Sequence, residues 1–269
     1  MELVKLHSLK QMMVHGLAAL GLLAAASTAQ ASQLADIEQR GVLRVAVPQD
    51  FPPFGSVGPD LKPRGYDVDM AAYLAEEMGL KLELIPVTSA NRIPYLQTGK
   101  ADLVISSLGK NEERERAIDF TEAYAPFFLG VFGNGELPVA AAADLDGRVV
   151  GVTRGAVEDM ELEKVLPASA RLQRFEDNNT TISAYLSGQV QLIATGNLVA
   201  AEIAERHADK APVAKFMLKD SPCYIGLKKG ETELRDKVNT LIAQALADGT
   251  LERISQTWLK APLPAGFGS

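Results

Sequence analysis

Short apolar segments alternate with helical patterns along this chain, and that alternation limits the folds that are open to it. The strand-like segments of the first half are 42–47, 81–87 and 103–106. The helical patterns that follow them are 67–78, 89–98 and 112–117. Strands and helices that alternate in this order predict an α/β fold with a mostly parallel sheet covered by helices.

The alternation begins again near residue 127 and continues to residue 259. Its strand-like segments are 127–132, 148–153, 171–175, 192–194, 215–218 and 223–227. Its helical patterns are 157–165, 179–186, 198–207, 231–247 and 251–259. The sequence therefore predicts two α/β units of about 100 residues each, with the last two helices returning to the first unit.

The first residues have the pattern of a secretory signal peptide. Lys5 and Lys10 precede an apolar run at 16–26, and Ala29-Gln30-Ala31 follows as a cleavage site. The run is too short to span a bilayer, which takes about 20 apolar residues. The segment also lacks a cysteine that could carry a lipid anchor. We predict a signal peptide at 1–31 and a soluble periplasmic protein; the alternative is an N-terminal helix of the mature chain.

Composition argues against several classes of function. The net charge of −7 disfavours binding to nucleic acid or to an anionic membrane, because both need basic patches. Cys223 is the only cysteine, and of the three histidines only His207 lies beyond residues 1–31. A zinc site and a Ser–His or Cys–His catalytic pair are therefore not expected, and we predict neither a metal nor a cofactor.

The stretch DLVISSLGKNEERERAIDF, residues 102–120, joins a buried strand to a charged helix. In open α/β sheets, ligands bind beyond the carboxyl ends of the strands, where Ser106, Ser107 and Gly109 fall. The next helix offers free amides in its first turn, and Arg114 adds a planar, two-pronged donor for a carboxylate. This pattern favours an anion socket; an ordinary strand end followed by a solvated helix is the alternative.

Six segments, in this order along the chain, resemble one protein family. They are GVLRVAV with FPPF, GYDVDMAAYLAEEMG, NRIPYLQTGKADLVISS, EERERAIDFTEAY, LSGQVQLIATGNLVA and YIGLKKG. From Gly41 to Pro262 the chain is similar to the soluble substrate-binding proteins of ABC importers of the polar amino-acid type, extracellular solute-binding protein family 3. The resemblance implies a type II periplasmic-binding-protein fold, in which two hinge strands join two α/β lobes and a ligand is trapped between them.

The same resemblance implies a domain organisation and partners. Lobe 1 would comprise 32–130 and 224–269, and lobe 2 would comprise 131–223. The hinges would lie near 129–134 and 221–227. The ligand would be an amino acid or a related small carboxylate, and the partner would be the membrane permease of an ABC importer. The protein itself would act as a monomer.

Binding roles follow from the resemblance for several residues. Arg114 resembles the arginine that grips the α-carboxylate of the ligand, helped by Ser107. Phe51 resembles the aromatic wall against the ligand side chain, although it could equally belong to the core. Ser89 and Arg92 resemble the branch of the family that binds glutamate and aspartate, where the arginine reaches a side-chain carboxylate. The alternative for Arg92 is an exposed helix residue.

The chain departs from the family pattern at three positions. Gly109 and Val157 replace residues that usually carry a hydroxyl, and Gly196 replaces the aspartate that usually pairs with the ligand ammonium. An enclosed ammonium without a counter-charge is costly to desolvate. Either another acid, Glu158 or Asp50, takes this role, or the ligand lacks an α-ammonium. The uncharged amides of Asn197 and Asn178 could then serve a neutral or anionic ligand.

An exported enzyme is the main alternative to a binding protein. Cyclohexadienyl dehydratases resemble this fold, and their general-acid glutamate would fall at Val199. An apolar side chain cannot transfer a proton, so we predict that the chain is not an enzyme. An exported sensor or receptor module of the same fold is a third possibility.

Overall fold

A computed structural model describes residues 32–268, and the predicted signal peptide lies outside the described residues. One sheet has the strand order β5-β1-β6-β13-β7. Its strands are β5 (Lys81–Val87), β1 (Val42–Pro48), β6 (Leu103–Leu108), β13 (Cys223–Lys228) and β7 (Ile118–Ala125). β1 is parallel to β5 and β6, whereas β13 is antiparallel to β6 and β7. The sheet is mixed rather than mostly parallel, because β13 arrives from the second sheet and runs back between two strands of the first.

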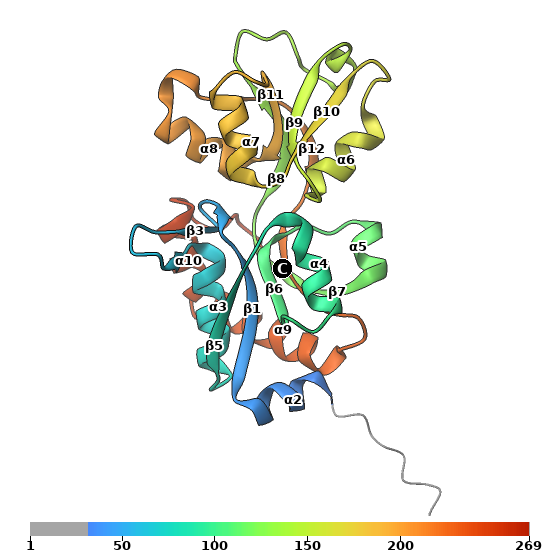
Figure 1. The fold of residues 1–269 in the computed structure, drawn as a ribbon. Coiled ribbons are helices and arrows are strands. Elements are labelled where there is room, and N and C mark those ends of the chain that lie inside the picture. Colours follow the sequence, from blue (N-terminus) through green and yellow to red (C-terminus); the bar gives the residue numbers. More distant parts are fainter. Residues whose placement is uncertain (1–31, 269) are drawn as a thin grey trace, which may run out of the picture. The chain divides into compact units, whose positions relative to one another are not determined.

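Helices cover both faces of this first sheet (Figure 1). They are α2 (Gln33–Arg40), α3 (Tyr66–Glu77), α4 (Arg92–Gln97), α5 (Glu112–Ala117), α9 (Thr232–Ala247) and α10 (Thr250–Trp258). Val45 of β1 belongs to the core cluster that contains Leu74 of α3, whereas its neighbour Ala46 belongs to the cluster that contains Leu96 of α4. Strands buried on both faces are rich in apolar residues, and the short runs Val45-Ala46-Val47 and Leu103-Val104-Ile105 made β1 and β6 visible in the sequence.

The second sheet has the strand order β10-β9-β11-β8-β12. Its strands are β10 (Arg171–Phe175), β9 (Val149–Thr153), β11 (Leu192–Gly196), β8 (Phe128–Gly133) and β12 (Val213–Asp220). Its main helices are α6 (Val157–Val165), α7 (Asn178–Leu186) and α8 (Asn197–Arg206). β9 is parallel to β10 and β11, and β8 is antiparallel to β11 and β12. Val131, Val150 and Leu162 are central to its core.

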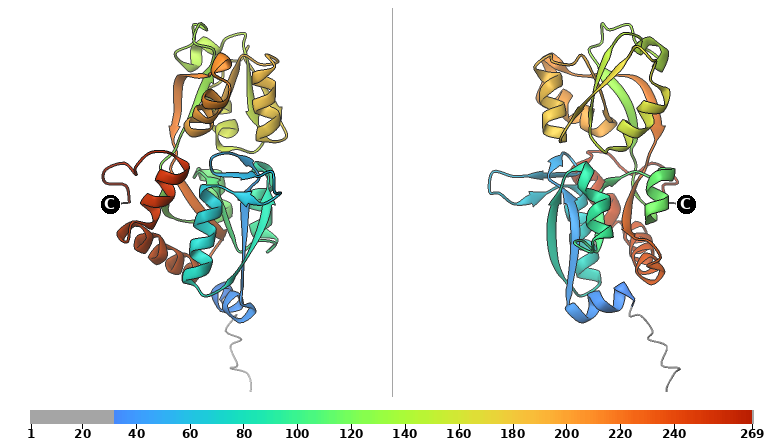
Figure 2. Two further views of the ribbon diagram at one scale, coloured as in Figure 1. Left: turned by 90° about the vertical axis from the view of Figure 1, so that its left-hand side faces the viewer. Right: turned by 45° about the vertical axis from the view of Figure 1, so that its right-hand side comes forward.

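The chain crosses between the two sheets twice, at 126–127 and again at 221–222. The backbone N–H of Ser221 donates to the carbonyl oxygen of Phe127 at 3.0 Å, so the two crossings are hydrogen-bonded to each other. Figure 2 shows the green and the orange segments that make these crossings. The first and second sheets, with their helices, form the two lobes of the predicted fold; the lobe boundaries at residues 130 and 223 stay predictions.

Several elements were not predicted from the sequence. They are α2, β7 and the small sheet formed by β2 (Asp50–Phe51), β3 (Gly55–Val57) and β4 (Pro63–Arg64). The small sheet lies in the turn-rich segment after β1, where glycines and prolines hide the strand pattern. Between residues 32 and 268, no helix is both long and apolar enough to cross a membrane.

Candidate functional site

A small cavity lies where the two sheets approach each other. Its lining residues are Phe51, Ser89, Arg92, Ser107, Gly109, Phe127, Leu129, Ala156, Val157 and Glu158. In the first lobe they come from the small sheet, the first sheet and its helical segments; the others come from the first crossing, from β8 and from the start of α6 in the second lobe. The cavity volume is about 10 Å³, room for about one water molecule. The site between the lobes is therefore polar and almost completely closed.

The turn after β6 presents an unsatisfied hydroxyl to this cavity. Ser107 has a φ of +40°, a left-handed conformation that is strained for a residue with a side chain. Its backbone N–H donates to Oδ2 of Asp67 at 2.7 Å, which fixes the turn. Its Oγ is buried and has no hydrogen-bond partner. A buried hydroxyl without a partner is unfavourable, so Ser107 Oγ is available to a polar ligand group.

Asp67, which holds Ser107, is buried at the start of α3. Oδ1 accepts a hydrogen bond of 2.5 Å from the Tyr124 hydroxyl. Burial raises the pKa of Asp67 to about 7, although the bonds from Tyr124 and Ser107 act in the opposite direction. Sequence reasoning did not single out Asp67. A signal was present, because Asp67, Ala71 and Leu74 share one buried helix face.

Arg114 connects the two lobes beside the cavity. Asn111 caps α5 by accepting a hydrogen bond from the Arg114 backbone N–H at 2.9 Å. The guanidinium is 4% exposed, and its Nη1 and Nη2 donate to the carbonyl oxygens of Gly109 and Gly155, each at 2.9 Å. Burial and, to a smaller extent, the nearby cation of Arg92 lower the pKa of Arg114 to about 9. Arg114 is not among the residues that line the cavity, because carbonyl groups from both lobes hold its guanidinium.

Arg92 is buried, not an exposed helix residue. It is 5% exposed, lines the cavity, and donates from Nε to Ser106 Oγ at 3.0 Å. Burial lowers its pKa, while the negative charges of Asp50, Glu158 and Asp67 act to raise it, Asp50 most strongly. Ser89 is also buried and lines the cavity. Both residues are thus close to the space where a ligand would be enclosed.

Two buried acids lie near these arginines, and they have different surroundings. Asp50 Oδ2 accepts hydrogen bonds from the backbone N–H of Asn178 at 2.7 Å and from its Nδ2 at 3.3 Å. Asn178 begins α7 in the second lobe, and its Oδ1 accepts from Thr153 Oγ1 at 2.8 Å. Asp50 therefore ties the first lobe to the N-terminus of a helix in the second, where the helix dipole favours a negative charge.

Glu158 is the second acid, and it alone of the two lines the cavity. It is 4% exposed, and it forms no ion pair and no hydrogen bond to another side chain among residues 32–268. Burial raises its pKa, while its own backbone amide and the charges of Arg92 and Arg114 lower it. The sequence had indicated Glu158 only as an alternative to an acid at position 196.

The three departures from the family pattern have local structural explanations. A Cβ at Gly196 would overlap the ring of Phe127, and a Cβ at Gly109 would collide with Ser221 Oγ and lie 3.1 Å from Cγ2 of Val157. Phe127 and Val157 thus fill the space that larger residues at these positions would need. Phe127 was not recognised from the sequence.

Phe51 and Asn197 complete the predicted set. Phe51 lines the cavity and also packs against Phe54 and Phe127, each with its ring centroid at 6.1 Å, so it is both a wall and a core residue. Asn197 Oδ1 accepts from the backbone N–H of Phe128 at 3.1 Å. Asn197 therefore holds the start of β8 and does not line the cavity.

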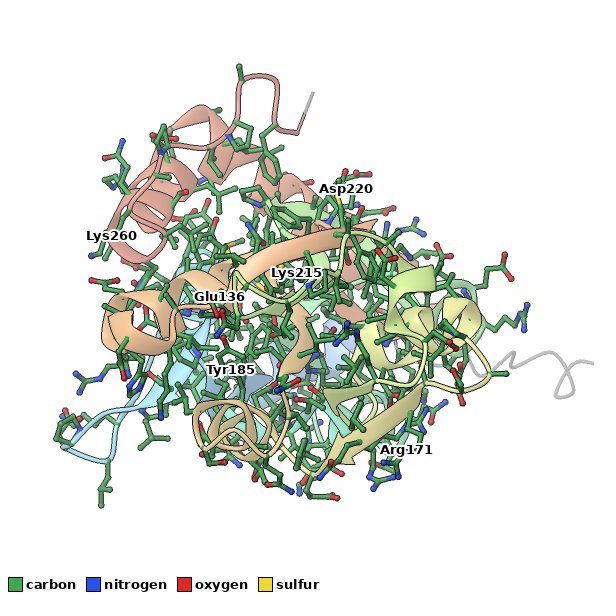
Figure 3. All side chains as sticks on the ribbon, turned by 90° about the horizontal axis from the view of Figure 1, so that it is seen from above. Glu136, Arg171, Tyr185, Lys215, Asp220 and Lys260 are labelled. Carbon is green, nitrogen blue, oxygen red and sulfur yellow. The ribbon has the colours of Figure 1, made fainter. Side chains whose placement is uncertain are left out.

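A larger depression of about 620 Å³ lies elsewhere, on the second lobe. Glu136 and Tyr185, which are labelled in Figure 3, contribute to its lining. The charged side chains that line it, Glu136, Asp209 and Lys210, are exposed. Within residues 32–268, no group of three or more His, Cys, Asp or Glu side chains is placed to hold a metal ion. The enclosed, charged cavity between the lobes is therefore the better candidate for a site.

Comparisons with known proteins identify the family and agree with the fold. Residues 43–261 match the family described as bacterial extracellular solute-binding proteins, family 3. The L-cystine-binding protein TcyJ of Escherichia coli is 28% identical over 265 residues, covering 96% of this chain and 98% of that protein. The solute receptor for L-cysteine of Neisseria gonorrhoeae has a similar structure, with a TM-score of 0.80 and 29% identity over 85% of this chain and 94% of the receptor. The cyclohexadienyl dehydratase of Pseudomonas aeruginosa is 27% identical over 268 residues, covering 95% of this chain and 97% of the enzyme.

Proposed function

This chain belongs to the bacterial extracellular solute-binding proteins, family 3, and from that premise we propose that it captures an amino acid or a related small carboxylate for an ABC importer. The family inferred from the sequence is therefore confirmed, as is the two-lobed α/β fold. Relatives that bind cystine, glutamine and arginine support an amino-acid ligand.

The observation that carries the proposal is the enclosed cavity itself. Two buried guanidinium groups, those of Arg92 and Arg114, lie at or beside it, and Ser107 Oγ lacks a partner. A ligand carboxylate can accept hydrogen bonds from a guanidinium and from a hydroxyl, and such charge-assisted bonds are strong when water is excluded. The groups around the cavity are thus suited to bind a carboxylate once the lobes have separated enough to admit it.

Capture requires the lobes to separate, because a cavity of about 10 Å³ cannot admit a ligand. Polar contacts join the lobes, among them Arg114 to Gly155, Asp50 to Asn178, and Lys219 Nζ to the Lys110 carbonyl oxygen at 2.6 Å. A ligand that contacts both lobes shifts the equilibrium toward the closed form by its differential affinity. The permease of an ABC importer would then distinguish the closed protein from the open one.

An enzymatic function has weaker support. Val199, at the position where the dehydratases would carry a general-acid glutamate, is buried in the apolar core and does not line the cavity. We therefore propose a binding protein without catalytic activity. We also propose that it is exported to the periplasm by a signal peptide, acts as a monomer and does not bind nucleic acid.

A thermal-shift screen tests the proposal. The protein is melted with saturating amino acids, dicarboxylates, 2-oxo acids or polyamines, and binding is then measured by calorimetry. A ligand present at about 100 times its Kd stabilises the folded state by about 2.7 kcal/mol. We expect at least one small carboxylate to raise the Tm. The proposal is wrong if none does so, or if a cyclohexadienyl acid is converted to product.

A further inference from the structure

Buried charged groups of both signs lie at or beside the cavity, and their charges balance. Arg92 and Arg114 supply two positive charges, and Glu158 and Asp50 supply two negative charges. All four side chains are at least nine-tenths buried, so their mutual interactions are only weakly screened. Asp67, whose carboxyl is held by Ser107 and Tyr124, can add at most one further negative charge. These buried groups therefore carry no excess positive charge that could neutralise a ligand of net negative charge.

A ligand ammonium needs an acid in the cavity, and only one acid is free to serve it. Position 196 carries no side chain, and the ring of Phe127 fills the space beside it. Asp50 is bound to the N-terminus of α7 through Asn178. Glu158 is the sole acid among the cavity-lining residues, and its carboxylate makes no ion pair within the described part of the chain.

The side chain of the ligand meets a different environment. Apart from the charged and hydroxyl groups already named, the cavity is lined by Phe51, Phe127, Leu129, Ala156 and Val157. No second acid is present among the lining residues to pair with a basic ligand side chain. A second carboxylate would need Arg92, which is bound to Ser106 and lies in the field of Asp50 and Glu158.

We propose that Glu158 pairs with the ligand ammonium, and that the site selects amino acids whose side chains carry no charge. This inference rests on the proposed function, since it assigns the ligand class within the same site. The acid that the family resemblance would place at the end of β11 is replaced here by one in the first turn of α6. Arg92 then balances Asp50 and Glu158 and does not receive a side-chain carboxylate.

The first test compares ligand classes on the wild-type protein by thermal shift and calorimetry. The probes are the twenty standard amino acids, cystine, and the 2-oxo acids pyruvate and 2-oxoglutarate. We expect the tightest ligand to be an amino acid with an uncharged side chain. If glutamate, aspartate, lysine, arginine or a 2-oxo acid binds most tightly, the inference is overturned while the proposed function stands. If no probe binds, both are overturned.

The second test replaces Glu158 by glutamine, which preserves shape and removes the charge. We expect Glu158→Gln to weaken the tightest amino acid by at least about 20-fold, because an ammonium would be buried without its partner. The affinity for 2-oxoglutarate relative to that amino acid should rise, since the cavity then has excess positive charge. A structural defect alone would not produce this change in preference.

Glu163→Gln is the matched control, because Glu163 is on the same helix, exposed, and paired with Arg174 outside the cavity. It should bind as the wild type does.

Unchanged amino-acid affinity in Glu158→Gln would overturn the inference. So would tighter binding of amino and 2-oxo acids alike, which would mean that Glu158 competes with the ligand carboxylate. If Glu158→Gln does not fold, Glu158→Asp is used instead, because it keeps the negative charge on a shorter side chain. This variant should lower the affinity for the same amino acid without changing the order of ligand preference. Unchanged affinity in Glu158→Asp would overturn the inference as well.

Discussion

The ring of Phe127 fills the space into which any side chain at position 196 would extend: a Cβ at Gly196 would overlap its Cζ atom. The ring is held in place by aromatic neighbours, with its centroid 5.2 Å from that of Phe54 and 6.1 Å from that of Phe51. A closely packed core does not easily accommodate added volume. The ring of Phe127 and a side chain at position 196 therefore exclude each other. The missing acid at 196 and the aromatic residue at 127 depend on each other.

Gly196→Asp should therefore destabilise the protein before it alters ligand preference. Overpacking typically costs about 1–3 kcal/mol, and here a buried carboxylate adds to that cost. The measurement is the free energy of unfolding in urea for Gly196→Asp, Phe127→Ala and the double variant. We expect the double variant to be more stable than the sum of the single effects implies. Strictly additive effects would show that the ring and position 196 do not compete for space.

Arg114→Ala should abolish ligand binding and leave the protein folded. Removing one partner of a buried charged interaction costs about 2–5 kcal/mol of affinity, and the cross-lobe bond to Gly155 is lost as well. Arg116→Ala is the matched control on the same short helix, because Arg116 is exposed and pairs only with Glu112. Calorimetry should find near-normal binding for the control and none for Arg114→Ala. Near-normal affinity in both would remove Arg114 from the site.

Asp50→Ala should weaken the closed form. It removes the carboxylate that accepts two hydrogen bonds from Asn178 at the start of α7. Hydrogen bonds to charged groups contribute about 1.5–3 kcal/mol each, so ligand affinity should fall by at least about tenfold. Small-angle scattering should show a larger radius of gyration for the variant without ligand. An exposed acid, Asp60, provides the control through Asp60→Ala; identical scattering curves for all three proteins would contradict the prediction.

Asp67 should make stability depend on pH in a particular direction. Burial raises its pKa to about 7, above the ordinary value of 3.8. The folded protein then holds the Asp67 proton more tightly than the unfolded chain does. The resulting contribution to the free energy of unfolding is fully present at pH values below the ordinary pKa. It is lost as the pH rises through about 7.

The comparison is between the wild type and Asp67→Asn, unfolded in urea from about pH 4 to about pH 8. The stability advantage of the wild type over Asp67→Asn should shrink as the pH rises and become constant above the raised pKa. Other buried acids, including Asp50 and Glu158, are present in both proteins and cancel in the difference. A difference that does not vary with pH would show that Asp67 titrates in the usual range.

Local pattern was sufficient to predict most of the fold. β6 is buried along its whole length and α3 has a regular apolar face, so each was visible within a short window of sequence. β7 was missed because its register depends on β13, whose Leu227 pairs with Asp119 more than a hundred residues earlier. An edge strand with mixed burial has no strong pattern of its own.

The candidate site was predictable to the extent that it lies on one strand–helix turn. Ser107, Gly109 and Arg114 are close in sequence, and the βα order alone placed them at a sheet edge. The contact of Phe127 with Gly196 joins the first crossing to the end of β11, about 70 residues later, and could not be read from either segment. The hydrogen bond between Asn178 and Asp50 likewise could not be predicted, because it depends on where β2 and α7 lie relative to each other. Without that contact, Asp50 and Glu158 were indistinguishable as candidate acids.

The hydrogen bond from Ser221 to Phe127 has a consequence for how the protein moves. The two connections are bonded side by side and together form the pivot between the lobes. Phe127 belongs to that pivot and also to the wall of the cavity. A rotation of the lobes that bends this pivot would therefore also reshape the wall of the binding space, which couples the opening of the protein to the shape of its pocket.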